Sequence, residues 1–211
     1  GGAAHRDLQH SLMSARPSIL IVLTPPLDPS TGGVQTSTVK MARMLATQEY
    51  EVGVFSYAHQ GHQSDVPVQL FSAPEPGGIA NTVNHAALAE TVGQFTPSVI
   101  INQMPYEHAI TETIAQHTGA LRVGCLRNTL YSVRNNLDQY ATRVLPKRLA
   151  PLLQNRAGRM ALLSWHRRRH ARDLRRILAG YDCFVMFAEP NLEELAYFVP
   201  DYDPDRVALI P

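Results

Sequence analysis

Short apolar segments alternate along this chain with longer segments in which apolar residues recur at helical spacing. Residues 19–23 form a continuous apolar run, which is typical of a parallel strand buried on both faces. The segment that follows repeats core-type residues at helical spacing, at Val34, Thr38, Met41, Ala42 and Leu45. The remaining pattern predicts strands at 52–57, 66–70, 99–102, 121–126, 183–187 and 207–210, and helices at 81–95, 107–117, 158–180 and 190–199. This alternation predicts an α/β fold, a doubly wound, mostly parallel, Rossmann-like sheet of about seven strands.

Local signals refine some of these elements. Pro67 within 66–70 indicates an edge strand, because proline cannot donate to a sheet ladder. Asn81 is a candidate N-cap for the helix that follows it. Pro190 is expected to begin the last helix and Pro200 to stop it. The residues of that helix expected to face inward are Leu192, Leu195, Ala196 and Val199.

Length and composition limit the class of protein. The 211 residues can bury a full core, and no apolar run approaches the ~20 residues that span a bilayer. Residues 1–17 lack the apolar stretch of a secretory signal and are expected to be a flexible leader or a tag remnant ahead of a domain at 18–211. Cys125 and Cys183 lie in predicted central strands, which favours buried free thiols over a disulfide or a metal site and indicates a reducing cytoplasm.

The charge is distributed unevenly. The net charge is only +1, but Arg143 to Arg176 holds eleven Lys or Arg and a single acid, Asp173. The rest of the chain holds eight basic residues against seventeen acidic ones. Residues 135–180 are therefore interpreted as a basic helical insert in an acidic body, and such an asymmetry indicates an anionic partner or surface.

A glycine pair at the start of the first helix is the strongest local motif. The strand 18–23 and the loop 24–31 lead into Gly32-Gly33-Val34-Gln35. Glycines let backbone N–H groups approach a ligand without interference from Cβ, and a helix N-terminus favours an anion. The loop matches neither the dinucleotide fingerprint nor the P-loop, which argues against nicotinamide, flavin and P-loop proteins. A turn glycine pair that binds nothing is the alternative interpretation.

Several segments together suggest a family. They are Gly32-Gly33-Val34-Gln35, the Glu51-Val52 strand start, Pro97-Ser98-Val99-Ile100-Ile101-Asn102 and Val207-Ala208-Leu209-Ile210-Pro211. In this order and spacing, over residues 18–211, the chain resembles the N-terminal, acceptor-side domain of a retaining GT-B glycosyltransferase of the family-4 type. Glu49 and Tyr50 stand where that family has glycine and histidine, a departure expected to alter only a turn.

The resemblance implies a function. It implies a transferase that moves a hexose from a nucleotide-sugar to a glycan or lipid-linked glycan acceptor, in bacterial surface polysaccharide synthesis at the cytoplasmic face of the inner membrane. The family holds its nucleotide chiefly in a C-terminal domain, which is expected to be absent here, so the chain alone is expected to be inactive. No cofactor and no metal are expected, since helix N-termini and basic side chains can take that electrostatic role.

The resemblance also assigns site residues. The donor phosphate or sugar would bind at Gly32, Gly33 and Val34. Amides, a phenol and a carboxylate suit sugar hydroxyls, so the acceptor is expected at Gln35, Asn102, Gln103, Tyr106, Glu107 and His108. For Glu107 and His108 the plainer interpretation is that they are exposed first-turn residues of a helix.

The catalytic residues are not identified, and Arg127 and Asn128 are the candidates. Arg127 stands at a strand end where the family commonly has a histidine. Its planar guanidinium suits a phosphate, and the alternative is a surface arginine at a strand end.

The helix at 158–180 leaves several functions open. Met160, Leu163, Leu174, Ile177 and Leu178 fall near one face, and Trp165, Arg168, Arg172, Arg175 and Arg176 lie opposite. The basic face suits an anionic membrane surface, and the resemblance favours that interpretation. Nucleic acid is not expected, because no reading motif accompanies the helix. A core-packed helix with a solvated arginine face is the structural alternative. The second function hypothesis is a non-catalytic Rossmann-like module that binds an anionic surface or partner through this helix.

Overall fold

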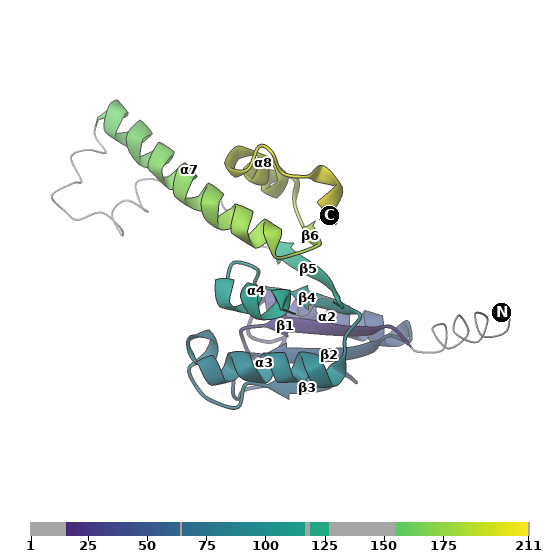
Figure 1. Ribbon diagram of the computed structural model, residues 1–211. Coiled ribbons are helices and arrows are strands. Elements are labelled where there is room, and N and C mark those ends of the chain that lie inside the picture. Colours follow the sequence, from purple (N-terminus) through teal and green to yellow (C-terminus); the bar gives the residue numbers. More distant parts are fainter. Residues whose placement is uncertain (1–15, 64, 117–118, 127–154, 211) are drawn as a thin grey trace, which may run out of the picture. The chain divides into compact units, whose positions relative to one another are not determined.

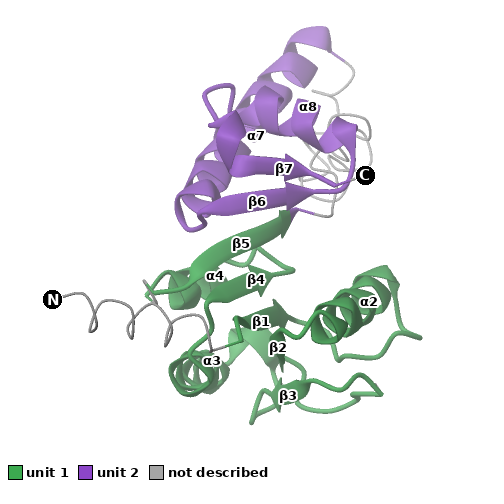
Figure 2. Cartoon of the chain, turned by 90° about the vertical axis from the view of Figure 1, so that its right-hand side faces the viewer, with its two compact units in different colours: residues 1–125 green, residues 126–211 purple. Residues whose placement is uncertain are grey.

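The computed structural model of the chain describes residues 16–63, 65–116, 119–126 and 155–210 (Figure 1). By its internal contacts the chain divides into two compact units, residues 1–125 and 126–211 (Figure 2). The first unit holds β1 (Ser18–Leu23), α2 (Gly33–Thr47), β2 (Glu51–Ser56), β3 (Gln69–Ser72), α3 (Thr82–Phe95), β4 (Val99–Asn102), α4 (His108–Ala115) and β5 (Leu121–Leu126), whose last residue begins the second unit. The second unit holds α7 (Arg156–Ala179), β6 (Cys183–Met186), α8 (Glu189–Phe198) and β7 (Val207–Leu209).

The strands of the first unit are parallel and follow the order β3-β2-β1-β4-β5. In the second unit β6 pairs in parallel with β7. The seven described strands confirm the predicted α/β, parallel, Rossmann-like fold. The chain runs outward from β1 to β3 and then returns to the other side of β1 as β4, so the strand order reverses between β1 and β4. In open α/β sheets this reversal is where ligands bind, at the carboxyl ends of the strands.

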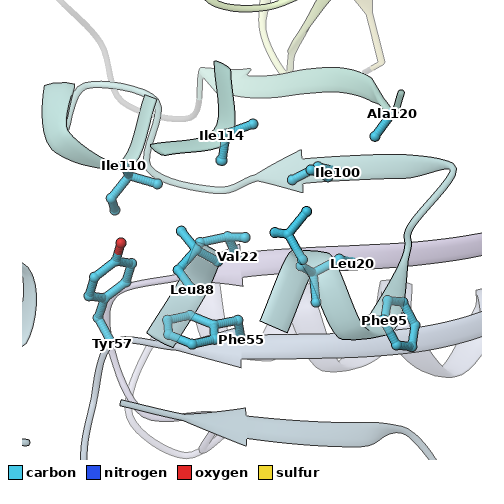
Figure 3. Packing of buried hydrophobic residues seen from close by; sticks show 11 residues of the cluster. Leu20, Val22, Phe55, Tyr57, Leu88, Phe95, Ile100, Ile110, Ile114 and Ala120 are labelled. Carbon is cyan, nitrogen blue, oxygen red and sulfur yellow. The ribbon is translucent and has the colours of Figure 1, made fainter. Parts of the chain in front are cut away.

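Side chains of the central strand β1 supply both faces of the sheet. Leu20 and Val22 join a buried cluster with residues of β2, α3, β4 and α4, which Figure 3 shows from close by. Ile19, Ile21 and Leu23 join a second cluster, with residues of α2 and β2. Both faces of β1 are therefore covered, which explains its continuous apolar run and confirms the prediction made from it.

Two local predictions in the first unit have different outcomes. Asn81 does cap α3, since its Oδ1 accepts a hydrogen bond of 3.0 Å from the Val83 N–H. The edge strand lies at β3, but it begins at Gln69 rather than at Val66. A tight turn, in which the Val68 N–H donates to the Val66 carbonyl at 2.8 Å, keeps the earlier residues out of the ladder. Val66 instead packs into the cluster with α2.

The helices of the second unit bury faces that differ in part from the predicted ones. In α7 the side chains of Leu174 and Ile177 are buried as expected, but Met160 is 58 % exposed. In α8 the residue Ala196, expected to face inward, is exposed. The buried residues of this helix are Asn191, Glu194, Leu195 and Phe198. The helix begins at Glu189, and spacing of three and four residues from Asn191 passes through this set without including Ala196.

Two further observations complete the fold. Cys125 is buried, Cys183 is half-buried, and both are free thiols. Across the described ranges no helix is both long enough and apolar enough to cross a membrane.

Candidate functional site

The carboxyl ends of β1 and β4 lie side by side at the point where the strand order reverses. Val22 of β1 is in register with Asn102 of β4. The N–H of Gln103 then donates a hydrogen bond of 2.9 Å to the Val22 carbonyl, which carries the pairing one residue further. The loop 24–32 after β1 and the loop 103–107 after β4 therefore start next to each other. The predicted donor and acceptor residues lie in or directly beside these loops. Gly32 ends the first loop, and Gly33, Val34 and Gln35 form the first turn of α2. Gln103, Tyr106 and Glu107 lie in the second loop, between Asn102 of β4 and His108 of α4.

The loop after β1 is held by its own hydrogen bonds. Leu27 is buried, and its N–H donates to His62 Nδ1 at 3.0 Å. Asp28 is also buried, and its Oδ1 accepts from the Ser30 N–H at 2.9 Å and from Ser30 Oγ at 2.7 Å. Thr31 Oγ1 donates to the Asp28 carbonyl at 2.8 Å. These bonds give the chain a defined approach to the first turn of α2.

The glycine pair at the start of α2 is not required by the backbone. Gly32 has φ 169° and ψ 172°, an extended conformation open to any residue, and Gly33 is not among the residues with positive φ. A Cβ at Gly33 would meet nothing within 4 Å, and a Cβ at Gly32 would meet the flexible end of Gln35 at 2.8 Å. The turn interpretation therefore loses its physical reason. The absence of a Cβ at both positions leaves the backbone there open to close approach.

The N-terminus of α2 offers hydrogen-bond donors. No described side chain caps it, and its first turn holds no acidic residue. The first bond inside the helix joins the Thr36 N–H to the Gly32 carbonyl at 3.0 Å. The N–H groups of Gly33, Val34 and Gln35 precede that bond, in the position where helices favour an anion.

Two neighbouring buried amides at the end of β4 have different surroundings. Asn102 is 0 % exposed, and its Oδ1 accepts a hydrogen bond of 2.9 Å from the Met104 N–H. Gln103 is 1 % exposed, and neither its Oε1 nor its Nε2 has a hydrogen-bond partner among the described residues. Leaving such a group unpaired costs about 1–3 kcal/mol, so each case needs an explanation. Within the described residues the Gln103 amide is such a case.

The other predicted acceptor residues lie on the same edge. Tyr106, Glu107 and His108 are half-buried where the loop after β4 enters α4. Glu107 occupies the N-cap position and His108 begins the helix. Both are thus first-turn residues, as the plainer interpretation expected, although neither is fully exposed. The structure brings these three residues, Asn102 and Gln103 to one strand end.

Arg127 and Asn128 lie outside the described residues. The residue before them, Leu126, accepts a hydrogen bond of 3.4 Å through its carbonyl from Nδ2 of Asn191. Asn191 is 4 % exposed, and its Oδ1 finds no partner in the described part of the chain. The sequence pattern predicted only apolar side chains on the buried face of this helix, so Asn191 was not among the predicted site residues. The available signal was a polar amide placed directly after Pro190 in the first turn.

The basic face of α7 borders a groove. Its cavity volume is about 830 Å³, and its described lining comprises Ser164, Arg167, Arg168, Ala171, Arg172, Arg175, Arg176, Ala179, Phe198 and Pro200. The four arginines predicted as an anion surface all belong to this lining, and Arg167 joins them. Trp165 is 45 % exposed, and the guanidinium of Arg169 lies 5.5 Å from its ring centre. No group of three or more His, Cys, Asp or Glu that could hold a metal ion occurs within the described ranges.

An imidazole pair lies on α7 against α8. The rings of His166 and His170 are 4.0 Å apart, and each lies 6.0 Å from the ring of Phe198. Burial, followed by the charges of His170 and Arg169, lowers the pKa of His166 to about 4. Burial also lowers the pKa of His170, against the opposing effect of Asp173. Burial therefore favours the neutral form of both imidazoles.

Comparison with known proteins shows the fold. No protein-family model and no curated protein matches the chain. Sucrose-phosphate synthase from Thermosynechococcus elongatus superposes with a TM-score of 0.62 at 13% identity, over 93% of this chain and 48% of that one. A glycosyltransferase from Rickettsia africae gives 0.54 at 15% identity, over 92% and 42%. WaaG, a glycosyltransferase involved in lipopolysaccharide biosynthesis, gives 0.50 at 13% identity, over 92% and 44%.

The coverage defines what is shared. The chain spans about half the length of each of these structures. It therefore has the fold of one Rossmann-like half of a GT-B glycosyltransferase, as the resemblance implied.

Proposed function

We propose that this chain is the acceptor-side half of a retaining GT-B transferase, which moves a hexose from a nucleotide-sugar to a glycan or lipid-linked glycan acceptor. The observation that carries the proposal is the buried side-chain amide of Gln103, which lies beside the carboxyl end of β1. Among the described residues this amide has no hydrogen-bond partner. An amide offers both a donor and an acceptor, which is what a sugar hydroxyl requires. The GT-B-like fold supports a transferase. The involvement of WaaG in lipopolysaccharide biosynthesis supports surface polysaccharide synthesis as its setting. The cytoplasmic face of the inner membrane belongs to the proposal as what the resemblance implies.

In this proposal the residues after β4 bind the acceptor and the start of α2 binds the donor. Gln103 pairs with an acceptor hydroxyl, with Tyr106 and His108 along the same edge. The N–H groups of Gly33 and Val34 face the donor diphosphate, where they stabilise the negative charge that develops as the leaving group departs. The acceptor oxygen forms the new bond to the anomeric carbon, and the bond from that carbon to the diphosphate oxygen breaks. The acceptor proton passes to the departing diphosphate on the same face, so the chain needs no side-chain base.

The second half of such an enzyme would hold the nucleotide, so this chain alone should transfer little or no sugar. The proposal includes no metal and no cofactor, because the N-terminus of α2 and basic side chains supply the positive field. Acceptor binding, by contrast, should be measurable on the chain as it stands.

Saturation-transfer NMR with hexose-terminated oligosaccharides tests the acceptor site directly. The wild-type chain should transfer saturation to at least one oligosaccharide, and Gln103→Met should abolish the signal because it removes both polar atoms while keeping the shape. Gln94→Met is the control, since Gln94 is exposed at the far end of α3 and its Nε2 donates to Glu90 Oε1 at 2.9 Å. Equal signals from the wild type and Gln103→Met, or no signal from the wild type, would contradict the acceptor site.

A donor-side test uses a fusion to a nucleotide-binding GT-B half. Gly33→Val should then lower transfer by about tenfold or more, the equivalent of ~1.4 kcal/mol in the transition state. The added side chain enters space that is open at this position, so the melting temperature should hardly change. Unchanged transfer by this variant would argue against a ligand at the glycine pair.

The second candidate function is a non-catalytic module that binds an anionic partner through α7. The observation that favours it is the arginine-lined groove. Both functions can coexist, because the groove residues and the β1–β4 edge belong to different units.

A further inference from the structure

The arginines of the groove form an ordered row. Arg168, Arg172 and Arg176 follow one another at intervals of four residues on α7 and all line the groove. With a rise of about 1.5 Å per residue, successive members stand about 6 Å apart along the helix axis. All three side chains are exposed.

The other two arginines of the lining already have partners. Arg167 Nε donates to the Tyr197 carbonyl at 3.0 Å, and its guanidinium lies 4.8 Å from the Tyr197 ring centre. Arg175 forms an ion pair with Asp201 at 2.7 Å. These interactions hold both side chains along the wall of the groove.

The row itself carries positive charge that no ion pair among the described residues offsets. Neither an ion pair nor a hydrogen bond joins Arg168, Arg172 or Arg176 to another described side chain. The helix holds eight arginines and one acid, Asp173. Like charges four residues apart on a helix destabilise it, so an anion in the groove would relieve a repulsion as well as form new hydrogen bonds.

The packing of α7 favours a small ligand over a lipid surface as the partner of this groove. A helix that lies in a membrane interface needs an exposed apolar face. The apolar face of α7, with Ala171, Leu174 and Ile177, is buried within the protein. The exposed Met160 and Trp165 are not part of the groove lining. A volume of about 830 Å³ instead falls in the range of small-molecule sites.

We propose that this groove binds a small molecule with two or more phosphate groups, held by Arg168, Arg172 and Arg176. Guanidinium groups bind phosphate oxygens in pairs, and three of them in a row match several linked negative charges better than a single carboxylate. Phe198 and Pro200 offer an apolar wall for the rest of the ligand. This inference uses only residues of the second unit and does not depend on the transferase proposal.

Calorimetric titration of the whole chain with inorganic pyrophosphate tests the groove. The double variant Arg168→Gln/Arg172→Gln should raise the dissociation constant by about 100-fold, roughly tenfold for each charge-assisted hydrogen-bonding group that is removed. The matched control is Arg156→Gln/Arg169→Gln, which removes the same charge from exposed positions of the same helix outside the groove. That control should stay within about threefold of the wild type, because neither side chain lines the groove and solvent screens charges that do not contact the ligand. Circular dichroism confirms that both variants fold.

Three further results would overturn the proposal. Equal weakening in the two double variants would show attraction to net charge alone. Loss of pyrophosphate binding in Gly33→Val, with binding retained in the groove variant, would place the anion at α2 instead. Flotation with phosphatidylglycerol vesicles but not with phosphatidylcholine vesicles, without any pyrophosphate binding, would identify a membrane surface. Because Gly33→Val alters the glycine pair and not the groove, comparing the two variants distinguishes a failure of the groove proposal from a failure of the transferase proposal.

Discussion

Replacing each of the two buried amides at the end of β4 should change stability in opposite directions. Asn102→Leu and Gln103→Met each substitute the apolar residue closest in shape at a fully buried position. Asn102 supports the loop, because its Oδ1 accepts from the Met104 N–H at 2.9 Å. The Gln103 amide contributes no such bond within the described residues. The two substitutions therefore control for each other, because both replace a buried amide at the same strand end with an apolar side chain.

The magnitudes follow from hydrogen-bond pairing. Asn102→Leu leaves the Met104 N–H without its acceptor and should lower the free energy of unfolding by about 1–3 kcal/mol. Gln103→Met removes polar atoms that are shielded from water on folding without finding a described partner, so it should raise that free energy by about 1–3 kcal/mol. Each kcal/mol corresponds to about 2–4 °C in melting temperature for a chain of this size.

Urea unfolding followed by circular dichroism measures both changes, alongside acceptor binding by NMR. A more stable variant that no longer binds acceptor would identify Gln103 as a residue kept for function at a cost in stability. If Gln103→Met were as destabilising as Asn102→Leu, the amide would have a structural partner and the argument for the acceptor site would fail.

Three other changes test the packing and the titration. A Cβ at Gly53 would lie 3.1 Å from the rings of both Phe71 and Phe95, so Gly53→Ala should lower the urea unfolding free energy by about 1–3 kcal/mol, and an unchanged value would refute this tight packing. Gly93 is exposed in α3 with nothing within 4 Å of its Cβ position, so Gly93→Ala should instead raise it by about 0.5–1 kcal/mol, and a decrease would refute the open space. His166 has a pKa lowered to about 4, so its contribution to stability should be complete above pH 6.5 and should disappear as the pH falls toward 4. His166→Phe should flatten this part of the pH dependence, and an unchanged slope would refute the assignment.

Sequence patterns were sufficient where burial follows directly from local composition. The continuous apolar run of β1 predicted a strand covered on both faces, and the two clusters on either side of it confirm this. Asn81 was identified as a cap because side-chain capping depends on residues two or three positions away. The loop after β1 was predicted from its glycine pair, and the loop after β4 was predicted because polar residues directly after a buried strand mark a sheet edge.

Tertiary structure decided the properties that depend on distant residues. Asn102 and Gln103 are adjacent amides that the sequence treats alike, and only the position of the Met104 N–H separates a paired amide from an unpaired one. The buried face of α8 was predicted incorrectly at Ala196, because a helix turns toward whatever packs on it. The glycine pair was a motif in the sequence, and its backbone angles and open surroundings removed the turn explanation. The local sequence pattern therefore determined the helices and strands and the carboxyl edge of the sheet. The hydrogen bonding of the two buried amides, the open space at Gly33 and the arginine-lined groove required the folded chain, since each depends on atoms brought together from separate segments.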